Sequence, residues 1–444
     1  MTPSEDEPGN HDVSDGATTD PQNSGDTKRR GTGRTSALVT ARVLLALLST
    51  VALLGTGIAW ATVNWFDSNT PTTSAIEDVG TAPDAPPAND GAEDILLVGT
   101  DSRTDAQGNP LPTRVLKQLR TQASPGTNTD TLIVLRIPHN GGKAYAVSIP
   151  RDSYVAIPGH GMGKINSAYG VAKADARKRF AAQGGMSQAE IETRSDQAGQ
   201  RSLLQTVQDF TGIRIDHYAE INLYGFYLLT KSIGGVQVCL KRATSDKDSG
   251  ADFPAGHQVI SGADALSFVR QRKGLPRGDL DRIVRQQVFL AAAARKVLSA
   301  GTLSRPSKLG SLVDTVRKSI VLDKGLDILS FLQRAQDLTS GHVTFVTIPV
   351  VNSNARSPEG ASIVAVDVAA VKSFVRGLIT QAPASGATSG APAPSTTPPQ
   401  TTGHALPLRP SGAATAGVRL RPLALAAPLH RAGPITPNDP HCVN

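Results

Sequence analysis

The stretch Asp94-Ile95-Leu96-Leu97-Val98-Gly99 decides the fold, because an apolar run of this length, ended by glycine, is typical of a buried β-strand. Two more strands are predicted further along the chain, at Thr131–Ile137 and Lys143–Ile149. The turn residues Asn140-Gly141-Gly142 separate these two strands and favour a hairpin between them. The three segments together predict a central β-sheet.

Helices are predicted after these strands, which makes the fold class α/β or α+β. The expected helical stretches are Ser187–Thr211, Tyr224–Ile233, Asp279–Leu298, segments between Ser307 and Leu338, and Val366–Ile379. A late strand is expected at Val343–Ile348. We therefore expect one folded domain over residues 93–380, in which helices flank the central sheet.

An apolar run over residues 43–63 precedes this domain and matches the ~20 residues that a helix needs to cross a bilayer. Residues 1–42 are mostly polar and are predicted to be disordered, with a basic cluster at Lys28–Arg34. Positive charge on this side predicts a cytoplasmic N-terminus and an extracytoplasmic domain, held at the cell membrane by a single span. A cleaved signal peptide is the alternative, because Ala59 and Ala61 are small.

Segments of biased composition flank the domain. Residues 64–92 are rich in Pro, Ala, Thr and Asp and predict a linker, and residues 381–444 predict a flexible Pro/Ala/Thr-rich tail. The cysteines Cys239 and Cys442 are too few for a disulfide framework. Outside the cell they would form one disulfide between tail and domain; the alternative is one buried thiol and one thiol on the tail.

The net charge of +7 suits an anionic partner, which could be nucleic acid, an acidic membrane surface or a phosphate-rich substrate. The sequence shows no helix-turn-helix signal and no basic patch interleaved with aromatic residues, which make up only 4% of the chain. The basic domain also follows a predicted membrane helix. Nucleic acid is therefore not the expected partner.

Charged residues lie at one end of each of the three predicted strands. Asp101-Ser102-Arg103 follows the first, Asn128-Thr129-Asp130 opens the second, and Pro150-Arg151-Asp152 closes the third. Each motif alone is also a common turn. If the three strands are neighbours, these side chains meet at one edge of the sheet, where carboxylates can hold a hard cation and arginines can bind phosphate.

Two later stretches carry more cationic side chains. Arg270 and Arg272 would point to one face of an extended segment, and a solvated pair is the alternative. Arg282 and Gln286 are four residues apart and share a face of the predicted helix, whose N-cap we interpret as Asp279. A cation in the first turn opposes the helix dipole, so a phosphate partner would explain Arg282.

These side chains together predict a site for Mg²⁺ and a diphosphate at the edge of the sheet. Asp101 and Asp130 are the expected metal ligands. Lys164 is a further candidate for lining the cleft, and an ordinary surface lysine is its alternative interpretation. The metal and the guanidinium groups would neutralise the charge that builds up on a leaving phosphate.

At these motifs the sequence resembles the LytR-CpsA-Psr family of cell-wall glycopolymer ligases. The resemblance runs from about Asp94 to Leu298. Besides the three strand-end motifs, it includes Lys164–Tyr169, Ile215–Tyr218, Ile233–Val236 and the arginine-rich stretch Leu266–Gln287. Many members carry an arginine just ahead of the Thr-Asp-Thr step, where this chain has Asn128.

The resemblance implies a Mg²⁺-dependent phosphotransferase. Its expected reaction moves a teichoic-acid-like or other anionic wall polymer from an undecaprenyl pyrophosphate carrier to peptidoglycan and releases lipid phosphate. The pyrophosphate would be bound by Arg103, Arg151, Arg270, Arg272, Arg282 and Gln286. Asp101 and Arg151 are the residues whose alteration we expect to abolish turnover, and the lipid tail would lie in an apolar groove.

Two other functions fit parts of the same sequence. A hydrolase would use water at the same site to cleave the polyprenyl pyrophosphate. A membrane-bound transcriptional attenuator, which the older naming of the family suggests, would fit better if the domain were cytoplasmic. A test of polymer transfer against simple phosphate release separates the ligase from the hydrolase.

Overall fold

The structure is a computed structural model, and it describes residues 71–83, 85–122, 126–298, 315, 319–326, 343–380 and 442–444. The chain divides into two compact units, 1–65 and 66–444, and all described residues belong to the second. The predicted membrane helix at 43–63 and the predicted disordered segment 1–42 lie outside the described residues. Within the described part, no helix has both the length and the apolar character of a membrane span.

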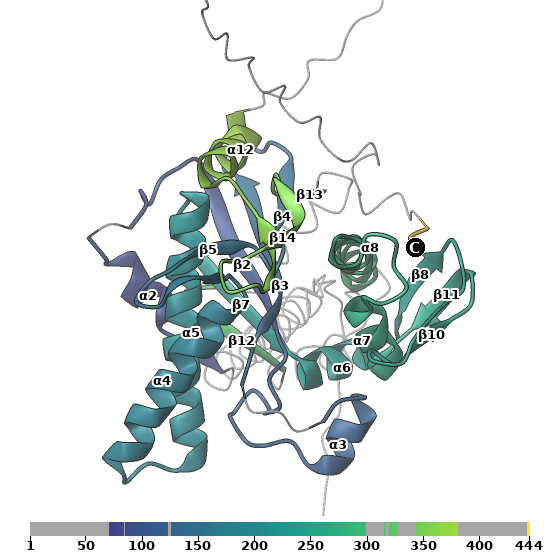
Figure 1. The fold of residues 1–444 in the computed structure, drawn as a ribbon, viewed down its shortest axis with the longest axis horizontal. Helices are drawn as coiled ribbons and strands as arrows, with labels where there is room; N and C mark the ends of the chain where they lie inside the picture. Colours follow the sequence, from purple (N-terminus) through teal and green to yellow (C-terminus); the bar gives the residue numbers. More distant parts are fainter. Residues whose placement is uncertain are drawn as a thin grey trace, which may run out of the picture. The chain divides into compact units, whose positions relative to one another are not determined.

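A seven-stranded mixed sheet forms the centre of the fold (Figure 1). In spatial order its strands are β1 (Thr72–Thr73), β12 (Ile320–Asp323), β7 (His217–Asn222), β2 (Ala92–Thr100), β3 (Thr129–Pro138), β4 (Ala144–Ser148) and β13 (Val343–Thr347). The predicted strands β2, β3, β4 and β13 are confirmed, and β3 runs antiparallel to both β2 and β4. The α/β fold class is thereby confirmed.

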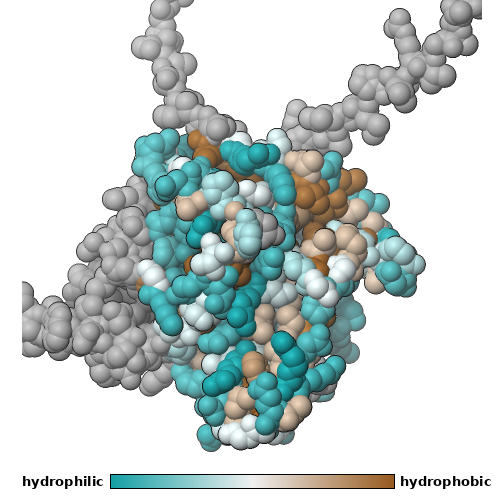
Figure 2. All heavy atoms as spheres, turned by 90° about the vertical axis from the view of Figure 1, so that its left-hand side faces the viewer, coloured by the Kyte–Doolittle hydropathy of each residue, from teal (hydrophilic) through white to brown (hydrophobic). Residues whose placement is uncertain are grey.

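One face of the sheet is covered by α2 (Ala75–Gly80), α4 (Ser167–Gln183), α5 (Gln188–Thr211) and α12 (Val368–Thr380) (Figure 1). Leu96 and Val98 of β2 pack there against Leu203 and Leu204 of α5, all of them buried. Burial of side chains of this size stabilises the fold by about 1.5–3 kcal/mol each. The outer surface of this helical layer is mainly hydrophilic (Figure 2).

Local chemistry sets both ends of α5, which the sequence predicted. Ser187 accepts a hydrogen bond from the Glu190 amide at 3.2 Å, and the Glu190 carboxylate accepts one from the Ser187 amide at 3.1 Å. This capping box satisfies two amides that the helix leaves free. Gly212 ends the helix with φ 72°, a left-handed conformation that glycine adopts without strain.

The opposite face of the sheet is covered by α8 (Asp279–Leu298), whose predicted bounds are confirmed. Ala291 of this helix packs with Ile133, Ala146 and Phe345 from β3, β4 and β13. The helical prediction between Ser307 and Leu338 is wrong for Ile320–Asp323, which form strand β12, and most of the remainder lies outside the described residues.

A second hydrophobic core lies beside α8 and was not predicted. It is built by α6 (Leu223–Ser232), α7 (Gly262–Arg270), the middle of α8, β8 (Val236–Leu240), β10 (Ala251–Phe253) and β11 (Gly256–Ile260). Strand β9 (Thr244–Asp246) pairs with β10. The Phe268 ring at its centre is fully buried, with ring centroids 5.9 Å from Phe253 and 6.3 Å from Phe289. This core holds α7 and α8 beside each other at the edge of the main sheet.

The remaining described elements lie around these two cores. They are α3 (Thr113–Gln118), β5 (Tyr154–Ile157), β6 (Gly161–Lys164), β14 (Asn352–Arg356) and β15 (Ser362–Ala365). The strands β5 and β6 form a hairpin directly after the Arg151 motif, so Lys164 returns beside it.

A buried ion pair lies on the central strands β2 and β3. Arg136 and Asp94 are both 0% exposed, and their side chains are 2.6 Å apart. Asp90 also approaches Arg136, at 2.9 Å. Burial raises the pKa of Asp94, whereas the Arg136 charge opposes this shift and favours the ionised carboxylate. Such a pair depends on both partners, because either charge alone would be buried without compensation.

The linker prediction for residues 64–92 is wrong for part of that range. Thr72 and Thr73 pair with β12 as strand β1, and α2 follows directly. Ala75 and Val79 are four residues apart in this helix, so both reach the main core, where they are buried. The folded region therefore begins ahead of residue 93.

The last residues of the predicted tail are tied to the second core. Cys442 forms a disulfide with Cys239 of β8, which decides between the two alternatives for the cysteines. Val443 forms a β-bridge with Leu240. The fully buried Arg285 of α8 donates to the carbonyl oxygen of Asn444 at 2.5 Å. Residues 381–441 lie outside the described residues.

Candidate anion-binding site

The three strand-end motifs meet at one edge of the sheet, as predicted. Because β3 is antiparallel to β2 and β4, the start of β3 lies beside the ends of both neighbours. The Asp101 amide donates to the Asn128 carbonyl at 3.0 Å, and the Asn128 amide donates to the Asp101 carboxylate at 2.7 Å. Arg151 reaches Asp130 with an N–O distance of 2.5 Å.

The arginines of the second core face these strand ends. The extended arrangement expected for Arg270 and Arg272 is wrong, because Arg270 is the last residue of α7 and Arg272 lies in the connection to α8. The buried Phe268 requires this helix, since it turns the ring into the second core. Arg282 lies one turn into α8 and is almost fully buried.

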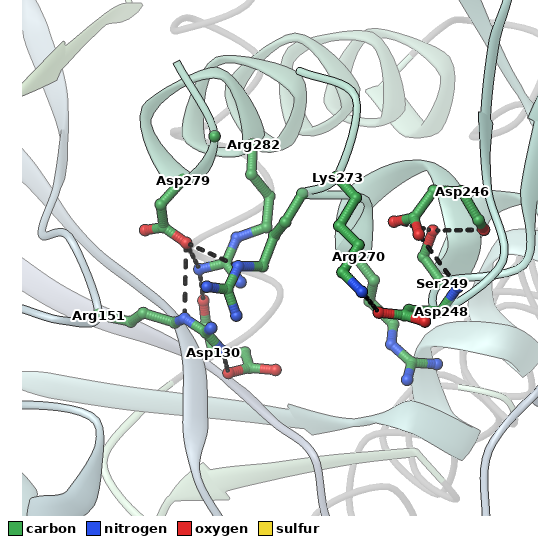
Figure 3. Close-up of a pocket in the computed structure, with 11 residues that line it drawn as sticks. Asp130, Arg151, Asp246, Asp248, Ser249, Arg270, Lys273, Asp279 and Arg282 are labelled. Atoms are coloured by element: carbon green, nitrogen blue, oxygen red, sulfur yellow. Dashed lines mark hydrogen bonds and ion pairs between the residues drawn. The ribbon is translucent and has the colours of Figure 1, made fainter. Parts of the chain in front are cut away.

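A cavity of about 420 Å³ lies between these groups (Figure 3). It is lined by Asp130, Arg151, Asp246, Asp248, Ser249, Arg270, Arg272, Lys273, Gly278, Asp279 and Arg282. Five of these side chains are cationic and four are carboxylates. The cavity therefore gathers positive charge from the strand ends and from α7–α8, which lie far apart in the sequence.

Arg151 is the cationic side chain that joins the two sides of the cavity. Besides Asp130, it lies 3.5 Å from Asp279 and 3.8 Å from Asp152. Burial lowers the pKa of Arg151, but the charges of Asp130, Asp279 and Asp152 outweigh burial and raise it. The guanidinium is therefore held charged and in a fixed position.

Arg282 and Arg270 are cations held in a poorly solvated place. Burial lowers the pKa of Arg282 to about 10, and its closest counter-charge is Asp279, at 2.8 Å. Burial also lowers the pKa of Arg270, whose guanidinium donates to the Leu119 carbonyl at 3.4 Å. At a pKa of about 10, Arg282 remains charged at neutral pH. A buried cation without a full counter-charge is stabilised by an incoming anion.

Other predicted site residues lie near this cavity but do not line it. Arg103 pairs with Asp101 at 3.0 Å, and Lys164 pairs with Asp152 at 3.0 Å. Gln286 donates to the Val269 carbonyl at 3.3 Å, so it fixes the end of α7. Of the predicted residues, Asp130, Arg151, Arg270, Arg272 and Arg282 line the cavity.

The oxygen donors at the strand ends fit a hard cation. Asp101 and Asp130 belong to adjacent strand ends, because Thr100 pairs with Thr129 and the Asp101 carboxylate accepts from the Asn128 amide at 2.7 Å. Mg²⁺ is commonly bound by one or two carboxylates together with substrate phosphates and water. Elsewhere in the described part of the chain, Cys239, His257 and Cys442 form the one group of three or more potential ligands, and its thiols are in the disulfide.

Several residues lining the cavity were missed by sequence reasoning. Asp246 ends β9, Asp248 and Ser249 lie in the turn from β9 to β10, and Lys273 pairs with Asp248 at 2.5 Å. Nothing in that turn sequence distinguishes it from an ordinary surface turn. Asp279 was interpreted only as a helix cap, although its i, i+3 spacing to Arg282 is a recognisable signal for an ion pair.

Comparisons with known proteins point in the same direction as the resemblance noted in the sequence. A model of the LytR_cpsA_psr family matches residues 63–378. The cell wall biosynthesis protein LcpA of Corynebacterium glutamicum is 46% identical over 339 residues, which cover 75% of this chain and 64% of LcpA. The polyisoprenyl-teichoic acid–peptidoglycan teichoic acid transferase TagU of Oceanobacillus iheyensis is 31% identical over 241 residues, covering 54% of this chain and 62% of TagU.

The chain thus spans slightly less than two thirds of the length of these relatives. Among solved structures, B. subtilis TagV matches 66% of this chain and 97% of its own, with 21% identity and a TM-score of 0.47. A LytR-Csp2A-Psr enzyme from Actinomyces oris matches 69% of this chain and 95% of its own, with 19% identity and a TM-score of 0.46.

Proposed function

The chain belongs to the LytR_cpsA_psr family, and from this premise we propose that it is a transferase that attaches a cell-wall polymer to peptidoglycan. Two relatives support this class of reaction by their names, LcpA for cell wall biosynthesis and TagU for transfer between a polyisoprenyl-teichoic acid and peptidoglycan. We further propose that the polymer arrives on undecaprenyl pyrophosphate. The observation that carries this proposal is the cavity in which Arg151, Arg270, Arg272 and Arg282 converge.

A diphosphate suits this cavity better than other small anions. Guanidinium groups form forked hydrogen bonds that match phosphate oxygens, and several of them are needed to balance the charge of two linked phosphates. The four arginines come from a strand end, the end of α7, its connection and α8. The cavity volume of about 420 Å³ accommodates a diphosphate together with part of the sugar attached to it.

The proposed reaction breaks one phosphorus–oxygen bond and forms another. A hydroxyl oxygen of peptidoglycan attacks the phosphorus next to the polymer, and the bond from that phosphorus to the bridging oxygen breaks. The lipid leaves as its monophosphate, and the hydroxyl proton passes to a base. Negative charge grows on the bridging oxygen, where Arg151 and Arg282 would stabilise it because they are already fixed and poorly solvated.

We propose that Asp101 and Asp130 hold a Mg²⁺ ion at the strand ends. When bound, the ion would neutralise phosphate charge and polarise the phosphorus–oxygen bonds. The two aspartates now contact Arg103 and Arg151, so both carboxylates are already aimed at the cluster that would receive the substrate. Asp101 and Asp130 would supply the oxygen ligands of the ion. Arg103 and Arg151 would hold these two carboxylates in place.

We also propose that residues 43–63 anchor the protein in the cell membrane, with the N-terminus in the cytoplasm and the catalytic domain outside. The sequence supports this arrangement through the length of the apolar run and the basic residues ahead of it. Such an anchor would keep the cavity close to a lipid-borne substrate.

The proposal is tested with the full chain in lipid nanodiscs. Purified lipid-linked polymer, Mg²⁺ and a peptidoglycan oligomer are supplied, and both products are measured. We expect a polymer–peptidoglycan conjugate and an equal amount of lipid monophosphate. Lipid monophosphate without conjugate would favour the hydrolase, in which water replaces the peptidoglycan hydroxyl. If neither product forms, the proposal is rejected. Arg201→Ala is the matched control, because Arg201 pairs with the exposed Asp78 at 2.9 Å and lies outside the cavity.

A further inference from the structure

The carboxylates of the cavity need an explanation, because an anion-binding site should repel them. Asp246 is satisfied inside its own turn, where it accepts from the Asp248 amide at 3.0 Å and from the Ser249 hydroxyl at 2.9 Å. Asp248 pairs with the exposed Lys273. Asp130 is a candidate metal ligand. Asp279 is the one carboxylate lining the cavity whose presence none of these roles explains.

The Asp279 carboxylate lies at the centre of the arginines. Its Oδ1 atom is 2.8 Å from Arg282, 3.5 Å from Arg151 and 3.8 Å from Arg272 (Figure 3). The side chain is only 15% exposed. Neither of its oxygens makes a hydrogen bond of good geometry, although both are buried. The carboxylate is therefore held by charge alone, at the point where three guanidinium groups converge.

This point is where an oxygen of a bound phosphate would also be most stable. Three cations around one oxygen is the arrangement that phosphate-binding sites use, and two anions cannot share it. A substrate phosphate must therefore either stay outside the cluster or displace the carboxylate.

We propose that Asp279 is an internal substitute for substrate phosphate. In the free protein its carboxylate occupies the arginine cluster, and a phosphate oxygen of the lipid-linked diphosphate displaces it on binding. This inference rests on the proposed function, since it assumes that the cavity receives a diphosphate. Asp279 is a positioning and selectivity residue in this account, because it acts through the arginines.

The exchange would have two effects. Without a carboxylate between them, Arg151, Arg272 and Arg282 would repel one another, so Asp279 keeps the arginines assembled before substrate arrives. Because a ligand must displace the Asp279 carboxylate, it needs more negative charge than one carboxylate carries. A diphosphate can outcompete a single carboxylate, whereas a carboxylate ligand or another singly charged anion cannot. The cavity would thus reject the abundant weak anions of the cell surface.

The test is calorimetric titration of the full chain with inorganic pyrophosphate, without Mg²⁺, for the wild type and two variants. Asp279→Asn keeps the shape and removes the competing charge. Asp130 and Asp152 still hold Arg151 in place, so the loss of competition should dominate and the dissociation constant should fall on the order of tenfold. Asp248→Asn is the control, because it removes the same charge from the same cavity at a site that is 66% exposed. Solvent screens that site, so its affinity should change by no more than about twofold.

The outcomes are distinct. The inference is overturned if a folded Asp279→Asn variant binds pyrophosphate as weakly as the wild type or more weakly. It is also overturned if Asp248→Asn gains as much affinity as Asp279→Asn. If the wild type and both variants all fail to bind pyrophosphate, both without and with added Mg²⁺, the proposed function fails with it. A structure of the wild type with pyrophosphate needs no variant: Asp279 should have left ion-pair distance of Arg282. An intact 2.8 Å pair beside bound pyrophosphate would also overturn the inference.

Discussion

Replacement of Arg151 by alanine is the perturbation that bears most directly on the proposed site. The variant loses the guanidinium that lies 2.5 Å from Asp130 and faces the cavity. A hydrogen bond to a charged group contributes about 1.5–3 kcal/mol, and 1.4 kcal/mol corresponds to about tenfold in Kd. We therefore expect inorganic pyrophosphate to bind about 10- to 150-fold more weakly.

The same change should cost little stability. Asp152 keeps Lys164 at 3.0 Å and Asp279 keeps Arg282 at 2.8 Å, so both retain a cation. Asp130 is 30% exposed and is partly screened by solvent. The net loss should be about 1 kcal/mol, which corresponds to a Tm lower by about 2–4 °C for a domain of this size.

Calorimetric titration with pyrophosphate and thermal unfolding measure both effects on the same samples. Arg151→Lys should give an intermediate Kd, because lysine keeps the charge and loses the forked geometry. Arg201→Ala should bind as the wild type does, since Arg201 lies outside the cavity. The reasoning is refuted if Arg151→Ala is folded and binds pyrophosphate within about twofold of the wild type.

Three further predictions concern the fold. Arg136→Met leaves Asp94 buried without its counter-charge and should lower the free energy of unfolding by about 3–5 kcal/mol in urea titrations; a loss below 1 kcal/mol would contradict it. Cys239→Ser removes the disulfide to Cys442 and should cost about 2–4 kcal/mol, and reductant should then have no further effect on Tm. Burial lowers the pKa of His217, but Asp323 and Glu93 outweigh it and raise the pKa above 6.5. Charged His217 therefore stabilises the fold below pH 6.5, and this stability is lost as pH rises through the raised pKa, so the Tm difference from His217→Gln should be larger at pH 6 than at pH 9.

The parts of the fold that the sequence predicted are those with long, regular patterns. β2, β3 and β4 are continuous apolar runs, and α8 was predicted with its observed bounds. The edge where Asp101, Asp130 and Arg151 meet follows from the adjacency of those strands, which short connections favour.

The second core could not be predicted, for physical reasons. Its strands are three to five residues long, and local patterns of that length do not separate strands from turns. The five residues Phe268–Arg272 do not by themselves separate an extended segment from the end of a helix, but burial of Phe268 between Phe253 and Phe289 is a tertiary contact that favours a helix. The disulfide joins residues 203 positions apart, and contacts between Leu240 and Val443 and between Arg285 and Asn444 bring them together.

The place of Asp279 was missed for a related reason. Its position at the start of a helix agrees with a cap, and the local sequence does not reveal that Arg151 and Arg272 approach from two other segments. Local rules describe one element at a time. A site built from four segments appears only when their packing is known.

The central claim is that this cavity holds the diphosphate of a lipid carrier. A structure of the full chain with Mg²⁺ and a short polyprenyl diphosphate tests it most directly. The account predicts both phosphate groups within hydrogen-bond distance of Arg151 and Arg282. A diphosphate bound elsewhere, with Arg151 still on Asp130 and Arg282 still on Asp279, would contradict it.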